Sequence, residues 1–283
     1  MKYDVLIPVG TKDFDILPYC LRSLHHLSPY PESVIVVCPQ RDPVTRILGK
    51  CNFDAVVVAD EEVFDFAGVG RKPGWFQQVI KLFQQVTRDD YLVWDADLIL
   101  PRRFHVFGFN DRPLLRYHKS PTAKPNAAYN AFMMEAFGQT PAVDMTMVCH
   151  HMFFRRCFVE QMIDCFLERH PKPDDRTDAK WFYDWLMSKG QDYELSVSEY
   201  EAYAHYVLNQ HPTAYELAKV FLDDFVFIRD KRSPTEIERR IGSTRAEMVA
   251  LHHRTRRRER SGISQVANQV LEVIDECAIM TTL

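Results

Sequence analysis

The stretch 91–101 constrains the fold more than any other, because it places two carboxylates inside an otherwise apolar run. It reads Y-L-V-W-D-A-D-L-I-L-P, so Asp95 and Asp97 follow one apolar segment and precede another. This pattern is typical of a buried strand that ends at the edge of a sheet. Ionised carboxylates are costly to bury unless a cation or several hydrogen bonds compensate their charge. The stretch therefore predicts a metal site at a sheet edge.

Other apolar runs alternate with helix-period segments through the first half of the chain. Strands are expected at 3–9, 33–38 and 54–58, and a helical pattern of apolar residues at 16–27 follows the first of them. Strands that are apolar throughout and separated by helices are typical of a mainly parallel sheet covered on both faces. The sequence therefore predicts an α/β, Rossmann-like fold, which binds ligands at the carboxyl ends of its strands.

Composition argues against several classes of protein. A chain of 283 residues that is 46% hydrophobic is long enough for one large α/β domain with a smaller appendage. Its formal net charge of −4 argues against a nucleic-acid or anionic-membrane binder, and no apolar run approaches the roughly 20 residues that a membrane span needs. The seven cysteines are odd in number and form no C-x-x-C motif, which indicates reduced thiols and a cytoplasmic protein.

Two segments near the acidic pair could contact phosphate. The loop 8–13, P-V-G-T-K-D, lacks both G-x-G-x-x-G and G-x-x-x-x-G-K-[ST], which argues against a dinucleotide oxidoreductase and a P-loop enzyme. Arg71 and Lys72 precede a helix with an apolar stripe at 76–86, and a helix N-terminus beside cations suits phosphate. A solvated loop that leads into a core helix explains the two cations equally well.

The second half of the chain offers fewer clear patterns. Segment 142–154 has the texture of a strand, and Ser198 and Glu201 have the positions of an N-cap and its capping-box partner. His150 and His151 are adjacent, so on a strand only one of them can face a given cleft. The chain after residue 212 is expected to be helical, and its arginines at 254–260 indicate a solvated cationic helix face.

The order of these motifs resembles that of the GT-A glycosyltransferases, in which a D-x-D motif ends a strand and holds the metal and diphosphate of a sugar nucleotide. The acidic pair, H-H-M-F-F-R-R at 150–156 and S-E-Y-E at 198–201 carry the resemblance, which is closest to a small group found in bacteria and in large DNA viruses of algae. It implies a GT-A catalytic domain at 1–212, with a nucleotide-binding half at 1–101 and an acceptor half at 102–212, and a helical C-terminal extension at 213–283.

Carried over by position, the resemblance also implies roles for individual residues. Asp97 would bind Mn²⁺ or Mg²⁺, and Asp95 would share the metal or hold the ribose. His211, with His252 and His253 as alternatives, would complete the metal site. The residues implied to lie near the nucleotide sugar are Pro8, Val9, Thr11, Asp13, Lys72, Trp75, Gln78, Lys81 and Asp95.

Glu199 would be the general base, although this sequence has Glu-Tyr where the family has Glu-Asp; an ordinary first-turn acid is the alternative. The implied activity is transfer of a sugar from a nucleotide sugar, UDP-linked and with a pentose such as xylose as a candidate, to a glycan hydroxyl. The reaction would invert the configuration of the transferred sugar. It would take place in the cytoplasm, which for a viral protein is the cytoplasm of the host cell. Two other classes stay open: a nucleotidyl or phosphoryl transferase, which also uses paired aspartates with Mg²⁺, and a non-catalytic module that binds nucleotide sugars.

Overall fold

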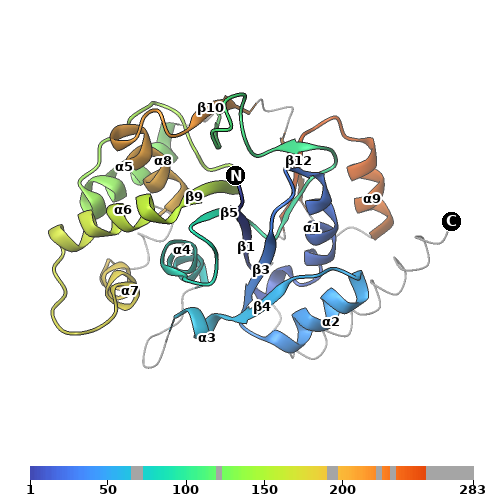
Figure 1. Ribbon diagram of the computed structural model, residues 1–283, viewed down its shortest axis with the longest axis horizontal. Helices are drawn as coiled ribbons and strands as arrows, with labels where there is room; N and C mark the ends of the chain where they lie inside the picture. Colours follow the sequence, from blue (N-terminus) through green and yellow to red (C-terminus); the bar gives the residue numbers. More distant parts are fainter. Residues whose placement is uncertain (65–72, 119–122, 190–196, 221–224, 230–233, 253–283) are drawn as a thin grey trace.

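The computed structural model describes residues 1–64, 73–118, 123–189, 197–220, 225–229 and 234–252 (Figure 1). At its centre is a five-stranded sheet in the order β4-β3-β1-β5-β9. The first four of its strands are parallel, and β9 is antiparallel to β5. This confirms the predicted α/β class with a mainly parallel sheet. The strands are β1 (Asp4–Pro8), β3 (Ser33–Cys38), β4 (Val56–Ala59), β5 (Asp90–Trp94) and β9 (His151–Arg155).

Helices cover both faces of this sheet. In Figure 1, α1 (Leu17–Ser23) and α2 (Arg41–Cys51) lie on one side of the sheet, and α4 (Pro73–Phe83) lies on the other. A further helix, α7 (Asp178–Ser188), packs against α4. Every residue of β1 is buried, because a strand at the centre of a doubly covered sheet meets apolar side chains on both faces.

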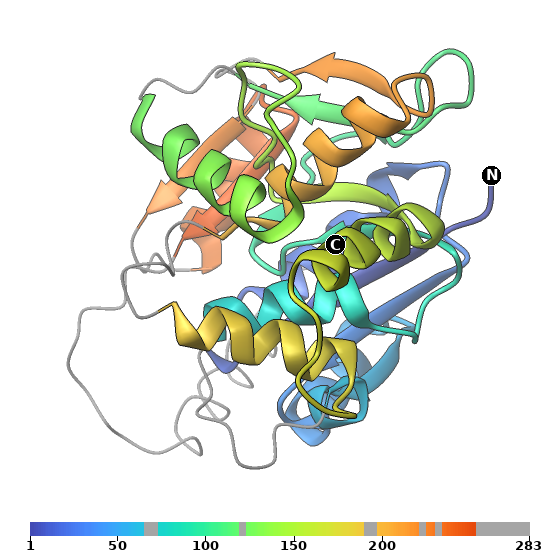
Figure 2. The same ribbon diagram turned by 90° about the vertical axis from the view of Figure 1, so that its left-hand side faces the viewer.

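Three more helices gather beside β9 (Figure 2). They are α5 (Ala123–Phe137), α6 (Arg156–Arg169) and α8 (Glu199–Gln210). Helix α8 contacts α5, α6 and β9, and it also contacts α4 on the face of the sheet. It therefore joins the second half of the chain to the parallel half.

The strand order reverses between β1 and β5. β1 pairs with β3 on one side and with β5 on the other, and the chain runs outward through β3 to β4 before it returns to β5. Open α/β sheets bind ligands at such a point, outside the carboxyl ends of the strands. Asp95 follows β5 directly at this edge, as the sequence predicts, and the turn η1 (Thr11–Asp13) follows β1 at the same edge.

Short strands form smaller sheets around the main one. β10 (Glu216–Lys219) pairs with β8 (Leu114–Tyr117). β11 (Phe225–Arg229) pairs with β12 (Met248–His252). β12 also pairs with β6 (Leu98–Ile99), which lies just after the acidic pair. The segment beyond residue 212 therefore returns to the candidate site.

These strands correct the expectation of a helical extension. Within the described part of 213–252, α9 (Pro234–Ser243) is the one helix, and the remaining elements are strands. Short apolar runs do not distinguish a strand from a helix by periodicity, and here their backbone groups find partners in distant strands. Residues 253–283, which include the arginines of 254–260, lie outside the described residues, and so does Lys72. No helix in the ranges given above is both long and apolar enough to cross a membrane.

Segment 142–154 forms a strand only from His151 onward. The residues before it form an irregular loop, in which Thr146 makes an isolated antiparallel bridge with His118. This loop leads to the edge of the sheet where β5 ends. The remaining short elements are β2 (Leu27–Ser28), β7 (Phe104–His105), α3 (Asp60–Val63) and η2 (Leu24–His26).

Candidate metal centre

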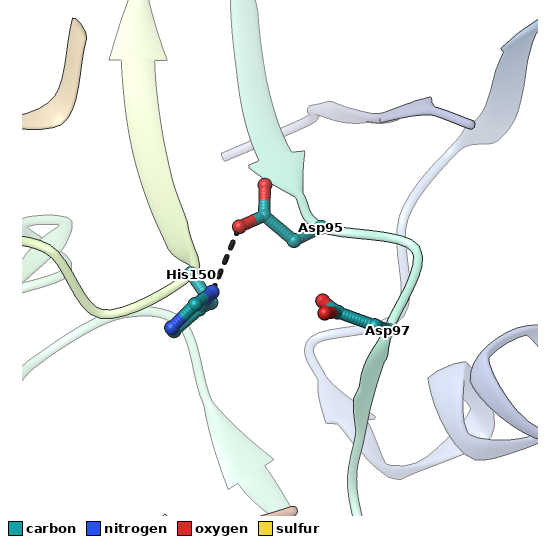
Figure 3. Close-up of side chains that lie close together, drawn as sticks. All are labelled: Asp95, Asp97 and His150. Atoms are coloured by element: carbon teal, nitrogen blue, oxygen red, sulfur yellow. Dashed lines mark hydrogen bonds and ion pairs between the residues drawn. The ribbon is translucent and has the colours of Figure 1, made fainter. Parts of the chain in front are cut away.

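Asp95, Asp97 and His150 bring their side chains together where β5 ends (Figure 3). One possible ligand atom from each of the three lies within 4.8 Å of the others. Because the antiparallel register pairs Trp94 with His151, the residue that precedes β9 lies beside the residue that follows β5. The N–H of Asp95 accordingly donates to the carbonyl of His150 at 2.9 Å. Sheet register therefore assembles the cluster.

The backbone of His150 lies in the left-handed region, with φ of 60°. This conformation costs a non-glycine residue about 1–2 kcal/mol, and residues held in such conformations cluster at functional sites. In this case it directs the imidazole toward Asp95, and His150 Nδ1 lies 3.0 Å from Asp95 Oδ2. The unfavourable backbone conformation is independent support for a functional role of His150.

His151 faces the opposite way. Its ring lies against Trp94 and Phe104, with centroid separations of 5.2 and 5.0 Å. Burial, together with the charge of Arg116, lowers the pKa of His151 to about 3, so this imidazole is neutral at physiological pH. The expectation that only one of the two adjacent histidines faces the cleft is confirmed.

The carboxylate of Asp95 accepts hydrogen bonds at both oxygens. Lys81 Nζ and the hydroxyl of Tyr200 each lie 2.8 Å from Oδ1, whereas His150 contacts Oδ2. Burial would raise the pKa of Asp95, but the charge of Lys81 and the hydrogen bond from His150 outweigh it and hold the pKa well below its usual range. The surrounding residues therefore keep Asp95 ionised.

Asp97 lies in a different environment. Burial, together with the charge of Asp95, raises the pKa of Asp97 above its usual value. Its backbone carbonyl accepts a hydrogen bond from the N–H of Leu251 at 2.9 Å, so β12 fixes the turn that carries it. A cation placed between the two carboxylates would favour the ionised form of both.

A buried ion pair connects α4 to the first turn of α8. Lys81 Nζ donates to Glu199 Oε1 at 2.6 Å and to the hydroxyl of Tyr200 at 3.1 Å. Gln78 lies one helical turn before Lys81, and its Oε1 accepts a hydrogen bond from the N–H of Glu199 at 2.8 Å. Gln78 and Lys81, both predicted to lie near the nucleotide sugar, thus contact α8 in this structure.

Ser198 caps α8 as predicted, because its Oγ accepts a hydrogen bond from the N–H of Glu201 at 3.3 Å. The carboxylate of Glu201 is engaged elsewhere. It accepts hydrogen bonds from the N–H of Met147 at 3.0 Å and from the hydroxyl of Thr146, and its Oε2 lies 3.3 Å from His205 Nε2. Glu201 therefore fastens to α8 the loop that carries His150, rather than closing a capping box.

The residues predicted to bind the nucleotide lie along the same sheet edge. Pro8 and Val9 are buried at the end of β1, and the N–H of Val9 continues the pairing with β3 by donating to Val37 O at 2.8 Å. Thr11 is exposed, whereas Asp13 is buried and its carboxylate lies 3.3 Å from Lys12 Nζ. Of the four residues of this loop that are predicted to bind the nucleotide, Thr11 is the exposed one.

Two other predicted site residues lie away from the acidic pair or within the core. Trp75 is 1% exposed in α4. His211 follows α8, where its Nε2 lies 2.8 Å from Gln161 Oε1 and its ring stacks on Phe158. Among the residues that the structure describes, the group able to hold a metal with the acidic pair contains His150. His150 therefore takes the place that the sequence assigns to His211.

A pocket of about 320 Å³ lies between α5, the loop before β9 and the first turn of α8. It is lined by Asn130 of α5, by residues 141–145 of the loop, and by Glu201 of α8. Its volume falls within the range of small-molecule sites. Glu201 belongs to the same helical turn as Tyr200, whose hydroxyl contacts Asp95. The pocket and the metal centre therefore share the first turn of α8.

No family model and no curated protein sequence matches this chain. Among solved structures, it is similar to the galactosyltransferase LgtC in complex with donor and acceptor sugar analogues, at 11% identity over 96% of this chain and 95% of that chain, with a TM-score of 0.44. It is also similar to mannosyl-3-phosphoglycerate synthase from Rubrobacter xylanophilus, at 18% identity over 54% and 52% of the two chains, with a TM-score of 0.38. A third similar structure is glucosyl-3-phosphoglycerate synthase from Mycobacterium tuberculosis in complex with Mn²⁺, UDP and glucosyl-3-phosphoglycerate. The identity is 15% over 58% of this chain and 65% of that chain, with a TM-score of 0.33. These low identities and TM-scores do not assign a function, which has to come from the site.

Proposed function

We propose that the protein is a metal-dependent glycosyltransferase that moves a sugar from a nucleotide sugar to a hydroxyl of an acceptor. The observation that carries the proposal is the cluster of Asp95, Asp97 and His150 at the carboxyl edge of the sheet, where the strand order reverses. This position suits a nucleotide, and a metal held there by carboxylates can also contact substrate phosphates. The resemblance of the D-x-D stretch to GT-A glycosyltransferases agrees with this placement.

The residues present fit a divalent cation. Carboxylate oxygens and an imidazole nitrogen are ligands that Mn²⁺ accepts. Lys81 Nζ pairs with the carboxylates of Asp95 and Glu199 at 2.8 and 2.6 Å, and the partly buried Asp97 adds a third carboxylate beside Asp95. Three carboxylates and one ammonium leave two formal negative charges for one divalent ion to balance. Buried charges require such compensation. Charge and donor type therefore agree on the same class of ion.

In the proposed mechanism, Asp95, Asp97 and His150 would hold the ion, and the exposed Thr11 would be available to the nucleotide. A bound Mn²⁺ or Mg²⁺ would offset the charge that develops on the nucleoside diphosphate as it leaves. The pocket at Asn130 and Glu201 would receive the acceptor, because its polar groups can orient a sugar and it shares the first turn of α8 with Tyr200, which contacts Asp95.

The role of general base stays a prediction for Glu199. A base has to reach the acceptor hydroxyl within hydrogen-bonding distance, but Glu199 is 2% exposed and its Oε1 contacts Lys81. This placement supports a role inside the network more than a role at the substrate. The finer proposals, a UDP-linked donor, a pentose such as xylose, a glycan acceptor, inversion and a cytoplasmic reaction, rest on the resemblance of the sequence.

Assays of the purified protein with a panel of nucleotide sugars, with Mn²⁺ and with EDTA, test the proposal. We expect UDP release that requires Mn²⁺ and is lost in Asp97→Ala. The matched control is Asp89→Ala, at the other end of β5, where the side chain is 98% exposed. UDP release that persists in Asp97→Ala or in EDTA would refute a metal-dependent transferase. Pyrophosphate as the product would indicate nucleotidyl transfer, and metal-dependent binding without turnover would indicate a binding module.

A further inference from the structure

We propose that Lys81 is a positioning residue of the metal centre and that Glu199 is its counter-ion. Lys81 would fix the rotation of the Asp95 carboxylate, so that one oxygen is held by the protein and the other is presented beside His150. The inference rests on the proposed metal site. It extends that site into the interface between α4 and α8.

The two oxygens of Asp95 have different partners. Oδ1 lies 2.8 Å from both Lys81 Nζ and the hydroxyl of Tyr200. Oδ2 lies 3.0 Å from His150 Nδ1. A carboxylate that is anchored at one oxygen cannot rotate about its Cβ–Cγ bond without breaking those hydrogen bonds. Its other oxygen is therefore directed consistently toward the side on which His150 lies.

The ammonium of Lys81 is itself fixed. A lysine has three N–H donors, and three acceptors surround Nζ: Asp95 Oδ1, Glu199 Oε1 and the hydroxyl of Tyr200, at 2.8, 2.6 and 3.1 Å. Lys81 is only 4% exposed. Two of its three acceptors, Asp95 and Glu199, are carboxylates that pair with its positive charge.

Both helices hold this arrangement from outside the metal centre. Gln78 Oε1 accepts from the N–H of Glu199 at 2.8 Å and thereby ties the first turn of α8 to α4. The carbonyl of Lys81 accepts from the hydroxyl of Tyr91 at 3.0 Å, which ties the same turn of α4 to β5. Asp95 follows β5 directly, so the distance between its carboxylate and Lys81 is set by three elements.

Stability is a weak explanation for such a network. The cost of removing a lysine and a glutamate from water can exceed the attraction between them, and apolar replacements of similar volume are often neutral. By contrast, residues that orient a metal ligand change metal affinity by about 10–100-fold when they are removed. The contact of Lys81 with Asp95 therefore fits a positioning role better than a purely structural one.

A charge-preserving double variant separates positioning from charge. Lys81→Met/Glu199→Gln removes one positive and one negative charge, so the formal charge around the metal site does not change, but the hydrogen bond to Asp95 Oδ1 from Lys81 is lost. We expect the dissociation constant for Mn²⁺, measured by titration of the free Mn²⁺ signal in electron paramagnetic resonance, to rise at least about 10-fold. Wild-type affinity in the folded double variant would overturn the proposal.

The single variants distinguish the two roles considered for Glu199. If Glu199 is the counter-ion of Lys81, Glu199→Gln weakens Mn²⁺ binding; unchanged Mn²⁺ affinity combined with lost sugar transfer would make it the base and refute the counter-ion role. Tyr200→Phe removes one donor to Asp95 Oδ1 with little change of shape. We expect it to raise the Mn²⁺ dissociation constant about fivefold, and this variant decides the question if the double variant does not fold.

The matched control is Lys2→Met/Glu32→Gln, an ion pair with Nζ and Oε2 3.4 Å apart whose side chains are 73% and 37% exposed. It makes the same two changes of residue type away from the site and should leave Mn²⁺ affinity unchanged. Thermal unfolding in EDTA shows whether each variant is folded. If the wild-type protein does not bind Mn²⁺, the proposed function fails; if it binds and the buried double variant binds equally, only the positioning role fails.

Discussion

Asp95 and Asp97 are two residues apart and can contribute ligand atoms to the same metal site, but their surroundings shift the pKa values of the two carboxyl groups in opposite directions. Asp95 is surrounded by hydrogen-bonding groups of Lys81, Tyr200 and His150. Burial raises the pKa of Asp95, but Lys81 and His150 outweigh this and lower it. On the Asp97 side, burial and the charge of Asp95 raise the pKa. Asp95 is therefore held as an anion before a metal binds, whereas the ionised form of Asp97 becomes favourable only when a cation lies beside it.

The first prediction, with the largest effect, concerns Asp95→Asn. It should abolish Mn²⁺ binding and also lower the free energy of unfolding in EDTA by about 2 kcal/mol, since Lys81 and Tyr200 lose the charged acceptor of their hydrogen bonds. Lys81 keeps Glu199 as its counter-ion, and the Asp95 side chain is 23% exposed, which limits the loss. Urea unfolding measures the loss of stability. A variant as stable as the wild type would show that Lys81 does not depend on Asp95.

Asp97→Asn should weaken Mn²⁺ binding by at least about 100-fold, because it removes one of the two charged ligands. Its effect on stability should have the opposite sign. The folded-state pKa of Asp97 is raised, so its ionised form destabilises the fold above that pKa, and the neutral amide removes this cost. We expect a higher melting temperature than the wild type in EDTA at pH 7.

Isothermal titration with Mn²⁺ and thermal unfolding, applied to both variants, make the comparison direct. A melting temperature of Asp97→Asn below that of the wild type would break the contrast between the two sides. If both variants lose Mn²⁺ binding and their melting temperatures shift in opposite directions relative to the wild type, the contrast between Asp95 and Asp97 is confirmed.

The smallest effects are expected at His150, which joins the two sides. His150→Ala should weaken Mn²⁺ binding about 10-fold, because it removes one ligand but retains both carboxylates. His150→Gly should bind Mn²⁺ equally weakly, but it should be about 1 kcal/mol more stable than His150→Ala, since glycine adopts the positive φ of 60° without penalty. Equal stability of the two variants would argue that the left-handed backbone is relaxed elsewhere.

Local patterns in the sequence were sufficient for the parallel half of the fold. The apolar run of β3 was predicted with its observed limits, Ser33–Cys38, because a strand covered on both faces has no polar positions. Asp95 and Asp97 are predicted at the sheet edge because ionised carboxylates are costly to bury within an apolar strand. Ser198 is predicted as the N-cap of α8 because capping depends on residues within one turn. Each of these features is decided by neighbours in the sequence or by burial alone.

The tertiary structure decided everything that depends on distant pairs. Lys81 and Glu199 are 118 residues apart, and no local pattern indicates that α4 and α8 meet. The antiparallel pairing of β9 with β5 placed His150, and not His211, beside the acidic pair. The pairing of β12 with β6 turned part of an expected helical segment into strands. Periodicity reports which face of an element is buried, whereas register and helix contacts determine which charged groups meet there.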